Sequence, residues 1–263
     1  MKRASLIILI VGMMFQSCIK IVQSSYRIPN PKCIEAGNCK ISSTGAVYLN
    51  LFGLIKTDFV TAGIKIEFDS LLIYIDPLVV DDTTKADYIF ITHNHLDHFS
   101  KTDIKKLTKP ETIFVGPGTI SKNISKNFRN NILKTVVTGD NIDFGKIKCE
   151  VVYSYNLKSK MHKKGNDNVG YIISCDSTRI YIAGDTDFIP EMKDLKNITV
   201  AIIPIGTGKT AMNPVDAAKA ANLIHPKIVI PIHYELGKNR EKEFSNLVDK
   251  DIDVQFFPVK AKE

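Results

Sequence analysis

A chain of 263 residues with 44% hydrophobic residues can bury a substantial core, which excludes a protein that is mainly disordered. Charged residues at 24%, 15 glycines, 11 prolines and a mean hydropathy of -0.01 exclude collagen-like chains, coiled coils and polytopic membrane proteins. The formal net charge of +7 favours anionic partners, such as phosphates, acidic lipids or nucleic acid, without choosing among them.

The first 17 residues have the pattern of a signal peptide. Lys2 and Arg3 form a basic start, residues 6–15 are an unbroken apolar run, and Ser17-Cys18 follows closely. Ten apolar residues are fewer than the about 20 that span a bilayer, so the pattern favours export over the alternative, a permanent transmembrane anchor. Ser17-Cys18 resembles the lipobox of bacterial lipoproteins, which implies a lipid on Cys18 that holds an exported, periplasmic or cell-surface protein to a membrane.

Residues 18–44 are expected to be an exported lead-in to the folded domain. They contain Cys33 and Cys39, which an oxidising compartment could join in a small disulfide loop, and the sequence leaves this pairing open. Cys149 and Cys175 lie in apolar, strand-like runs, so we expect them to be thiols of the core.

From about Gly45 the chain contains short runs rich in Ile, Val, Phe and Tyr, which predict strands. Ser100 and Asp103 have the spacing of a helix-capping box, and Pro214 begins a second helix-like segment. We expect helices over 100–107 and 214–224, and strands over 47–55, 64–68, 71–75, 88–92, 112–115, 147–155, 169–175, 179–183, 200–205 and 228–231. No repeat or linker divides this part, so the sequence predicts a single domain of the α/β (α+β) class.

Three of the six histidines lie in His93-Asn94-His95-Leu96-Asp97-His98, directly after an apolar run. In an extended segment, residues two apart project to the same side, so His93 and His95 can hold one metal ion. Asp97 and His98, in the turn that follows, can reach a second ion. A solvated histidine-rich loop is the alternative, but such a loop has no reason to follow a buried strand.

Two further strand ends supply candidate ligands. Gly184-Asp185 follows the apolar run 179–183, and the glycine permits a tight turn that would place Asp185 between two cations. His233 follows the run 228–231. Each residue alone has a structural alternative, but together with the first motif they predict a common metal site. His225 lies at the C-terminus of a predicted helix and is expected to be structural.

The His-x-His-x-Asp-His run, Gly184-Asp185-Thr186 and Pro231-Ile232-His233-Tyr234 resemble the metallo-β-lactamase superfamily. Within it, the chain is similar to the metal-dependent hydrolases that include the ascorbate-6-phosphate lactonases. The resemblance implies a four-layer αββα sandwich and a hydrolase domain over residues 45–258. It implies that His93, His95 and a third histidine bind one metal ion, that Asp97, His98 and His233 bind the other, and that Asp185 bridges them. Asp76 would be a structural acid near the site.

The third histidine follows from resemblance to one subgroup. Many relatives place it at the end of the strand that here reaches Tyr155-Asn156. The subgroup instead has Tyr-Asn followed by a His-Pro-Lys-Gly turn, which His162-Lys163-Lys164-Gly165 resembles with Lys163 in place of proline. This implies that His162 is the third histidine ligand.

Histidine and carboxylate ligands without cysteine suit zinc, manganese or iron, and we expect two divalent ions with zinc favoured. Two adjacent cations would generate hydroxide from bound water and polarise a carbonyl or phosphoryl oxygen, which predicts hydrolysis of an ester, lactone, amide or phosphoester. Asp97 and Asp185 would be the catalytic carboxylates, with Asp97 orienting the hydroxide. Asn156, Lys163 or Tyr234 would contact the substrate.

The lysines at 158, 160, 163 and 164 surround His162 and favour a small anionic substrate, although a solvated loop is the alternative. A second hypothesis is a phosphodiesterase acting on N-acyl phospholipid or nucleic acid, and export argues against nucleic acid. A third hypothesis is a non-catalytic lipoprotein that binds a metal or ligand. Such a protein would have no need to keep seven ligating side chains.

Overall fold

The computed structural model describes residues 19–29 and 31–260. The predicted signal peptide and Cys18 lie outside the described residues. Within the described part, no helix is both long and apolar enough to cross a membrane.

One seven-stranded sheet carries the histidine-rich motif. Its neighbouring strands β7, β8, β9 and β10 are parallel, so their carboxyl ends meet at one edge of the sheet. The histidine-rich motif follows β8 and therefore lies at this edge. In sheet order the strands are β10 (Ile132–Val136), β9 (Ile113–Pro117), β8 (Tyr88–Phe90), β7 (Leu71–Ile75), β6 (Ile64–Phe68), β3 (Cys39–Ser43) and β2 (Ile34–Ala36).

A second seven-stranded sheet carries the other candidate ligands. Strands β14, β15 and β16 are parallel, so Asp185 after β14 and His233 after β16 lie at a common edge. In sheet order the strands are β11 (Asn141–Asp143), β12 (Ile147–Tyr153), β13 (Val169–Cys175), β14 (Thr178–Ile182), β15 (Val200–Pro204), β16 (Ile228–Ile232) and β18 (Asp253–Val254).

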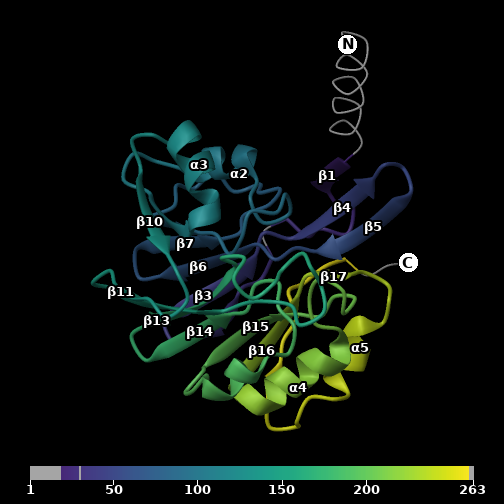
Figure 1. Cartoon of the computed structure of the whole chain (residues 1–263). Helices are drawn as coiled ribbons and strands as arrows, with labels where there is room; N and C mark the ends of the chain where they lie inside the picture. Colours follow the sequence, from purple (N-terminus) through teal and green to yellow (C-terminus); the bar gives the residue numbers. More distant parts are fainter. Residues whose placement is uncertain (1–18, 30, 261–263) are drawn as a thin grey trace.

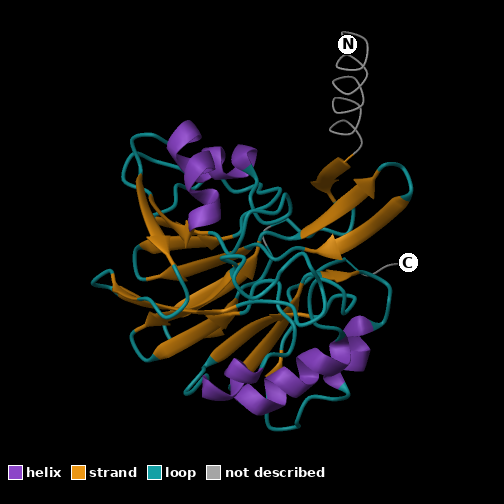
Figure 2. Cartoon of the chain, in the orientation of Figure 1, coloured by secondary structure: helices purple, strands orange, loops and turns teal. Residues whose placement is uncertain are grey.

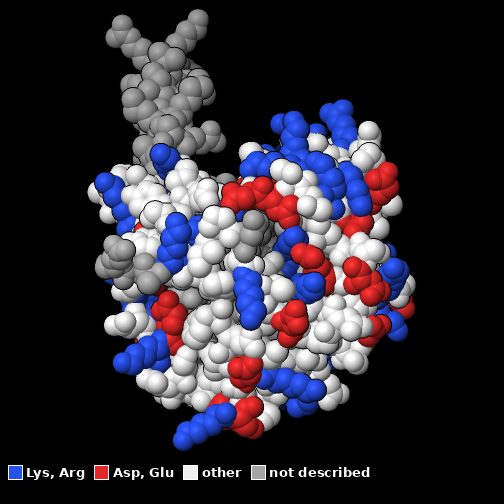
Figure 3. Space-filling view, turned by 180° about the vertical axis from the view of Figure 1, so that it is seen from behind, with Lys and Arg blue, Asp and Glu red and all other residues white. Residues whose placement is uncertain are grey.

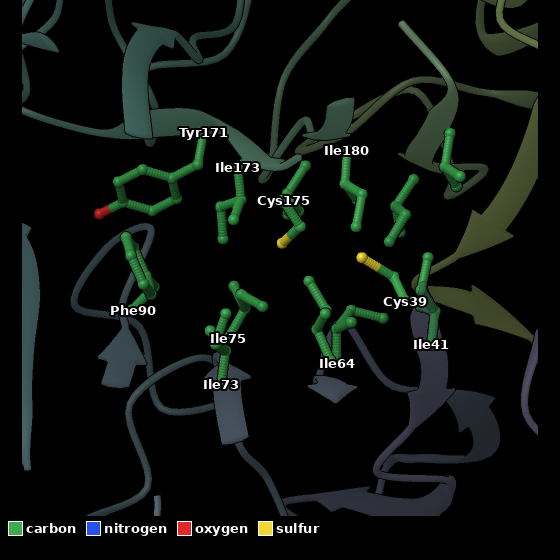
Figure 4. Packing of buried hydrophobic residues seen from close by; sticks show 14 of the residues in the cluster. Cys39, Ile41, Ile64, Ile73, Ile75, Phe90, Tyr171, Ile173, Cys175 and Ile180 are labelled. Atoms are coloured by element: carbon green, nitrogen blue, oxygen red, sulfur yellow. The ribbon is translucent and has the colours of Figure 1, made fainter. Parts of the chain in front are cut away.

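The two sheets pack face to face through a continuous hydrophobic core. Side chains alternate along each strand, so that one face of β6 and one face of β12 are buried while the other face is more exposed. Figure 4 shows Ile73 and Ile75 of the first sheet facing Ile173 of the second. The rings of Phe90 and Tyr171 meet edge to face with centroids 5.2 Å apart.

Helices cover the outer face of each sheet (Figures 1 and 2). The first sheet is covered by α2 (Lys101–Leu107) and α3 (Gly118–Asn127), and their buried side chains join Ile89 and Phe114 in a second core. The second sheet is covered by η1 (Pro190–Asp194), α4 (Pro214–Ile224) and α5 (Arg240–Ser245). The four-layer αββα sandwich is thereby confirmed.

Two helices begin at the positions that the sequence predicts. The hydroxyl of Ser100 accepts from Asp103 N at 3.4 Å before α2, and Asn213 accepts from Asp216 N at 2.9 Å before α4. Helix α3 was not predicted, because Pro117 makes no side-chain cap and only Ile120 and Ile124 of the helix are buried.

A smaller sheet contains β1 (Ile19–Gln23), β4 (Ala46–Leu51), β5 (Ile55–Val60) and β17 (Tyr234–Glu235), in that order. The prediction of one strand over 47–55 is therefore wrong, because this segment contains most of β4, a turn and the first residue of β5. Phe52 and Gly53 reverse the chain with positive φ angles of 55° and 74°. A phenylalanine in this conformation gives no turn signal in the sequence.

The segment before Gly45 belongs to the fold and is not a mere lead-in. Strands β2 and β3 extend the first sheet, and Ile34 and Ile41 lie in the core between the two sheets. Each of these strands is short and has few apolar residues, so the alternation of buried and exposed side chains cannot be recognised in the sequence. The pairing of Cys33 with Cys39 is not found, because the described cysteines are all free thiols. The thiols of Cys39 and Cys175 instead face each other across the two sheets (Figure 4).

Candidate metal centre

The loops at the carboxyl edges of the two sheets bring together all seven residues that the sequence proposed as metal ligands. Among the described residues, they form three overlapping groups whose ligand atoms lie within 4.8 Å of one another. The groups are His93, His95 and His162; His93, His98 and Asp185; and Asp97, His98 and His233.

Three imidazoles form the first side of the centre. Nδ1 of His95 lies 3.1 Å from Nε2 of His93 and 3.0 Å from Nε2 of His162. Nitrogen ligands at the usual zinc distance of about 2.1 Å in tetrahedral geometry would be separated by about 3.4 Å. The three nitrogens therefore have the spacing of ligands around a single ion.

Asp97, His98 and His233 form the second side. Oδ2 of Asp97 lies 3.3 Å from Nε2 of His233 and 3.9 Å from Nε2 of His98. The rings of His98 and His233 lie 5.2 Å apart with an interplanar angle of 31°. Both imidazoles thus present Nε2 to the same carboxylate oxygen.

Asp185 lies between the two sides. Its Oδ1 is 3.5 Å from Nε2 of His98 and 3.9 Å from Nε2 of His233, which belong to the second side. Its Oδ2 is 4.0 Å from Nε2 of His162, on the first side. One carboxylate therefore directs a different oxygen toward each group of histidines.

The backbone turns sharply where three strands reach the centre. Asp76 follows β7 with φ of 46°, His233 follows β16 with φ of 56°, and Gly184 follows β14 with φ of 64°. Residues other than glycine adopt this conformation rarely, and such strain concentrates at functional sites. At Gly184 a Cβ would lie 3.0 Å from Oγ of Ser154, so glycine also lets the chain pass close to its neighbours.

Asp76 and Thr92 orient two of the imidazoles. Oδ2 of Asp76 lies 2.8 Å from Nδ1 of His98, and Oγ1 of Thr92 lies 3.0 Å from Nδ1 of His93. The Thr92 hydroxyl donates to Asp76 at 2.5 Å, which joins the two supports. Each contact at Nδ1 leaves Nε2 directed into the centre, as in metal sites where a second residue holds the ligand. Asp76 was expected near the site, whereas no sequence pattern indicated a role for Thr92.

Asn156 orients His162 in the same way. Its Oδ1 lies 2.8 Å from Nδ1 of His162, and its backbone N–H donates to the His162 carbonyl at 2.6 Å. Asp187 in turn accepts from Nδ2 of Asn156 at 3.2 Å. Asn156 is buried, so it is placed to position His162 and not to contact the substrate as expected.

The histidines of the two sides differ in the direction in which their pKa values are shifted. Burial lowers the pKa of His93 and of His162, so these imidazoles are neutral at neutral pH. Burial alone would also lower the pKa of His98, but the carboxylates of Asp185, Asp97 and Asp76 outweigh it and raise the pKa. The pKa of His233 is raised in the same way, chiefly by Asp185 against the effect of burial.

The acidic groups are held in the ionised form. Burial would raise the pKa of Asp185, but His233 and His98 outweigh it and hold the pKa well below its usual value. His98 and His233 likewise lower the pKa of Asp97 against the effect of burial. Both carboxylates are therefore charged, as metal ligands must be.

Two buried atoms at the middle of the centre lack a hydrogen-bond partner, namely Nε2 of His98 and Oδ1 of Asp185. An unsatisfied buried polar atom costs about 1–3 kcal/mol, so such atoms call for an explanation. Both are potential metal ligands in a set of imidazoles and carboxylates that suits zinc, manganese or iron. The residues present therefore fit divalent metal ions.

A cavity of about 430 Å³ opens on His93 and His95, and Met161, Gly165 and Asn166 of the loop after β12 line it. The lysines of this loop differ in their contacts. Lys163 is exposed, whereas Lys164 lies 2.6 Å from Glu191 and over the ring of Tyr153.

Two other predicted residues lie away from the opening. Tyr234, expected to contact the substrate, is packed in the core between the second sheet and its helices. The physical reason is its position in β17, whose pairing with β5 directs the ring inward. His225 ends α4 in a left-handed conformation and pairs with Asp251 at 3.0 Å on the surface, in agreement with a structural role.

The family model described as the beta-lactamase superfamily domain matches residues 60–233. A UPF0173 metal-dependent hydrolase of Geobacillus sp. (strain WCH70) is 31% identical over 185 residues, which cover 65% of this chain and 81% of that protein. A UPF0173 metal-dependent hydrolase of Bacillus thuringiensis (strain Al Hakam) is 30% identical over 202 residues, which cover 71% of this chain and 88% of that protein.

Solved structures show the same fold. A proposed metal-dependent hydrolase of Parabacteroides distasonis superposes with a TM-score of 0.66 at 31% identity, covering 82% of this chain and 96% of that chain. The metallo hydrolase Igni18 of Ignicoccus hospitalis gives a TM-score of 0.61 at 20% identity, covering 77% of this chain and 94% of that chain. The particular likeness to ascorbate-6-phosphate lactonases stays a prediction. The chain belongs to the beta-lactamase superfamily and, within it, to the UPF0173 metal-dependent hydrolases.

Proposed function

We propose that the protein uses two divalent metal ions, with zinc favoured, to hydrolyse an ester, lactone, amide or phosphoester of a small anionic molecule. The observation that carries this proposal is the position of Asp185. Its Oδ1 faces His98 and His233, and its Oδ2 faces His162, so that one carboxylate can serve two ions. When bound, two such ions supply an activated water and a Lewis acid for the substrate oxygen.

The chain's own residues would hold and orient this chemistry. His93, His95 and His162 would bind one ion, while Asp97, His98 and His233 would bind the other. Asp97 is more exposed than Asp185, which suits a carboxylate that also orients the attacking water. Lys163 and its exposed neighbours beside the opening would attract an anionic substrate.

The test is a profile of hydrolysis by the metal-loaded protein on lactones, carboxylic esters, amides and phosphodiesters. Turnover of one class should disappear on chelation and return with the metal. Asp185→Asn should abolish it, while Asp176→Asn, at an exposed turn of the same sheet, should leave it unchanged. No metal-dependent turnover of any class would contradict the proposal and favour a non-catalytic binding protein.

We also propose that the protein is exported and anchored through a lipid on Cys18, on the strength of Lys2, Arg3 and the apolar run 6–15. Mass spectrometry of the mature N-terminus should find an acylated Cys18. An unmodified terminus at another residue would mean secretion without an anchor, and an intact Met1 on cytoplasmic protein would contradict export.

A further inference from the structure

The tip of the β4–β5 hairpin exposes three large apolar side chains within four residues. Leu54 is 87% exposed, Ile55 is 53% exposed and Phe52 is 42% exposed. Scattered apolar side chains are normal on a surface, but a continuous apolar patch marks an interaction site. Lys56 follows on the same strand and is also exposed.

An apolar groove of about 940 Å³ begins at this tip and runs toward α2. Phe52 and Ile19 line it on the side of the hairpin, and Leu96 lines it on the side of the metal centre. Leu96 is 65% exposed although it lies between the ligand candidates His95 and Asp97. The apolar surface therefore continues from the hairpin tip to the loop that carries the candidate ligands.

Beyond the groove, the segment that contains α2 and α3 is strongly basic. Residues 101–129, which include α2 and α3, contain seven Lys or Arg and two Asp or Glu. One of the two acids, Asp103, is buried and bonds to the backbone N–H groups of Val79 and Val80. Figure 3 shows Lys and Arg gathered at the upper right of the molecule, above a group of Asp and Glu, and Figure 1, seen from the other side, places α2 and α3 there and β1 with the hairpin at the other end of the same upper edge.

The start of the described chain lies beside the hairpin tip. In the β1–β4 pair, Ile19 is opposite Leu51, the residue before Phe52. The apolar run 6–15 precedes Ile19 by a few residues. Whether a lipid on Cys18 or the apolar run itself holds the chain in a membrane, the chain would leave the lipid surface next to Phe52 and Leu54.

We propose that this edge docks on an anionic phospholipid bilayer. The tip residues Leu54 and Ile55 enter the acyl region, and the exposed lysines of α2 and α3 contact the headgroups. Apolar burial together with attraction between basic side chains and acidic lipids is the usual basis of interfacial binding. Docking in this orientation holds the candidate metal centre beside the lipid surface. The proposal goes beyond the proposed hydrolysis and does not depend on it.

The absence of tryptophan from the chain permits a direct test with the full-length protein. Leu54→Trp places a single indole at the hairpin tip, and Leu223→Trp places one on α4, on the opposite helical layer, where Leu223 is 43% exposed. On phosphatidylcholine vesicles that contain phosphatidylglycerol, the emission of the Leu54→Trp protein should shift to the blue. It should also be quenched by brominated acyl chains. The emission of the Leu223→Trp protein should do neither.

A charge variant tests the second part of the surface. Lys101→Glu with Lys105→Glu should reduce the quenching at the Leu54→Trp reporter, whereas Lys193→Glu with Lys196→Glu, on the opposite layer, should not. An aqueous emission from the Leu54→Trp protein in the presence of these vesicles overturns the proposal, whether the protein has attached to them or not. Metal-dependent hydrolysis of a soluble substrate, measured without vesicles, shows separately whether the proposed activity holds.

Discussion

The carboxylate of Asp76 lies 2.8 Å from Nδ1 of His98, and both side chains are buried. The same carboxylate accepts from the backbone N–H of Thr92 at 2.8 Å, which ties it to the strand end that carries His93. Asp76 therefore leaves Nε2 as the nitrogen of His98 that can bind a metal.

Asp76→Asn should selectively weaken the binding of a metal ion at the second side of the centre, which contains His98. The amide keeps the size of the side chain but loses the negative charge that supports the imidazole, and such changes reduce metal affinity about 10- to 100-fold. Competition with a metal-binding dye should show this loss for one of the two ions, with Asp176→Asn unchanged. Equal weakening of both ions would indicate that Asp76 acts on the fold instead.

Gly184→Ala should destabilise the protein more than Gly139→Ala. Both glycines have positive φ, at 64° and 99°, so both variants carry a backbone penalty of about 1–2 kcal/mol. A Cβ at Gly139 meets no atom within 4 Å, whereas at Gly184 it meets Oγ of Ser154 at 3.0 Å and the carbonyl of Val169 at 3.2 Å. Denaturant unfolding of the metal-free proteins measures the difference. Equal losses would show that crowding beside Asp185 has no effect.

The two metal-binding steps should release different numbers of protons at neutral pH. His98 and His233 have raised pKa values in the metal-free protein, so an ion that binds them must displace protons. His93 and His162 have lowered pKa values and are already neutral. Affinity at the second side should therefore rise with pH more steeply than affinity at the first side. Calorimetric titration in buffers of different ionisation enthalpy counts the protons, and equal release in both steps would contradict this assignment.

Neutralising Lys160 and Lys163 together should raise KM for an anionic substrate and flatten its dependence on salt. These exposed lysines lie on the loop that carries His162, and their attraction for an anion is screened beyond about 8 Å at physiological salt. Lys164→Gln is the matched control, because Lys164 already pairs with Glu191. A neutral substrate analogue should respond to neither change. Equal effects on both substrates would leave the charge of the substrate open.

Most metal-ligand candidates were accessible to sequence analysis because they follow an apolar strand, whereas His162 followed only from the family resemblance. His93, Asp185 and His233 come after β8, β14 and β16, and the carboxyl ends of parallel strands meet at one edge. The αββα layers and most strands followed from the same alternation of apolar runs and from the family resemblance.

The residues that orient the candidate ligands could not be predicted in this way. The contact of His162 with the carbonyl of Thr210 joins residues 48 positions apart, and no local pattern specifies it. The amide of Asn156 is typical of a substrate-binding residue, and only its burial and its contact with Nδ1 of His162 show that it orients this histidine. The turn at Phe52 and the short strands β2 and β3 were likewise hidden, because tertiary packing determines them more than local propensity.

The proposed dinuclear centre is tested most directly by elemental analysis of protein purified without chelator and supplied with metal. The wild-type chain should hold two divalent ions, His162→Ala should lose one of them, and His225→Ala should keep both, since His225 lies on the surface with Asp251. A reproducible content of one ion or fewer in the wild-type protein, or an equal loss in the His162→Ala and His225→Ala proteins, would contradict the account.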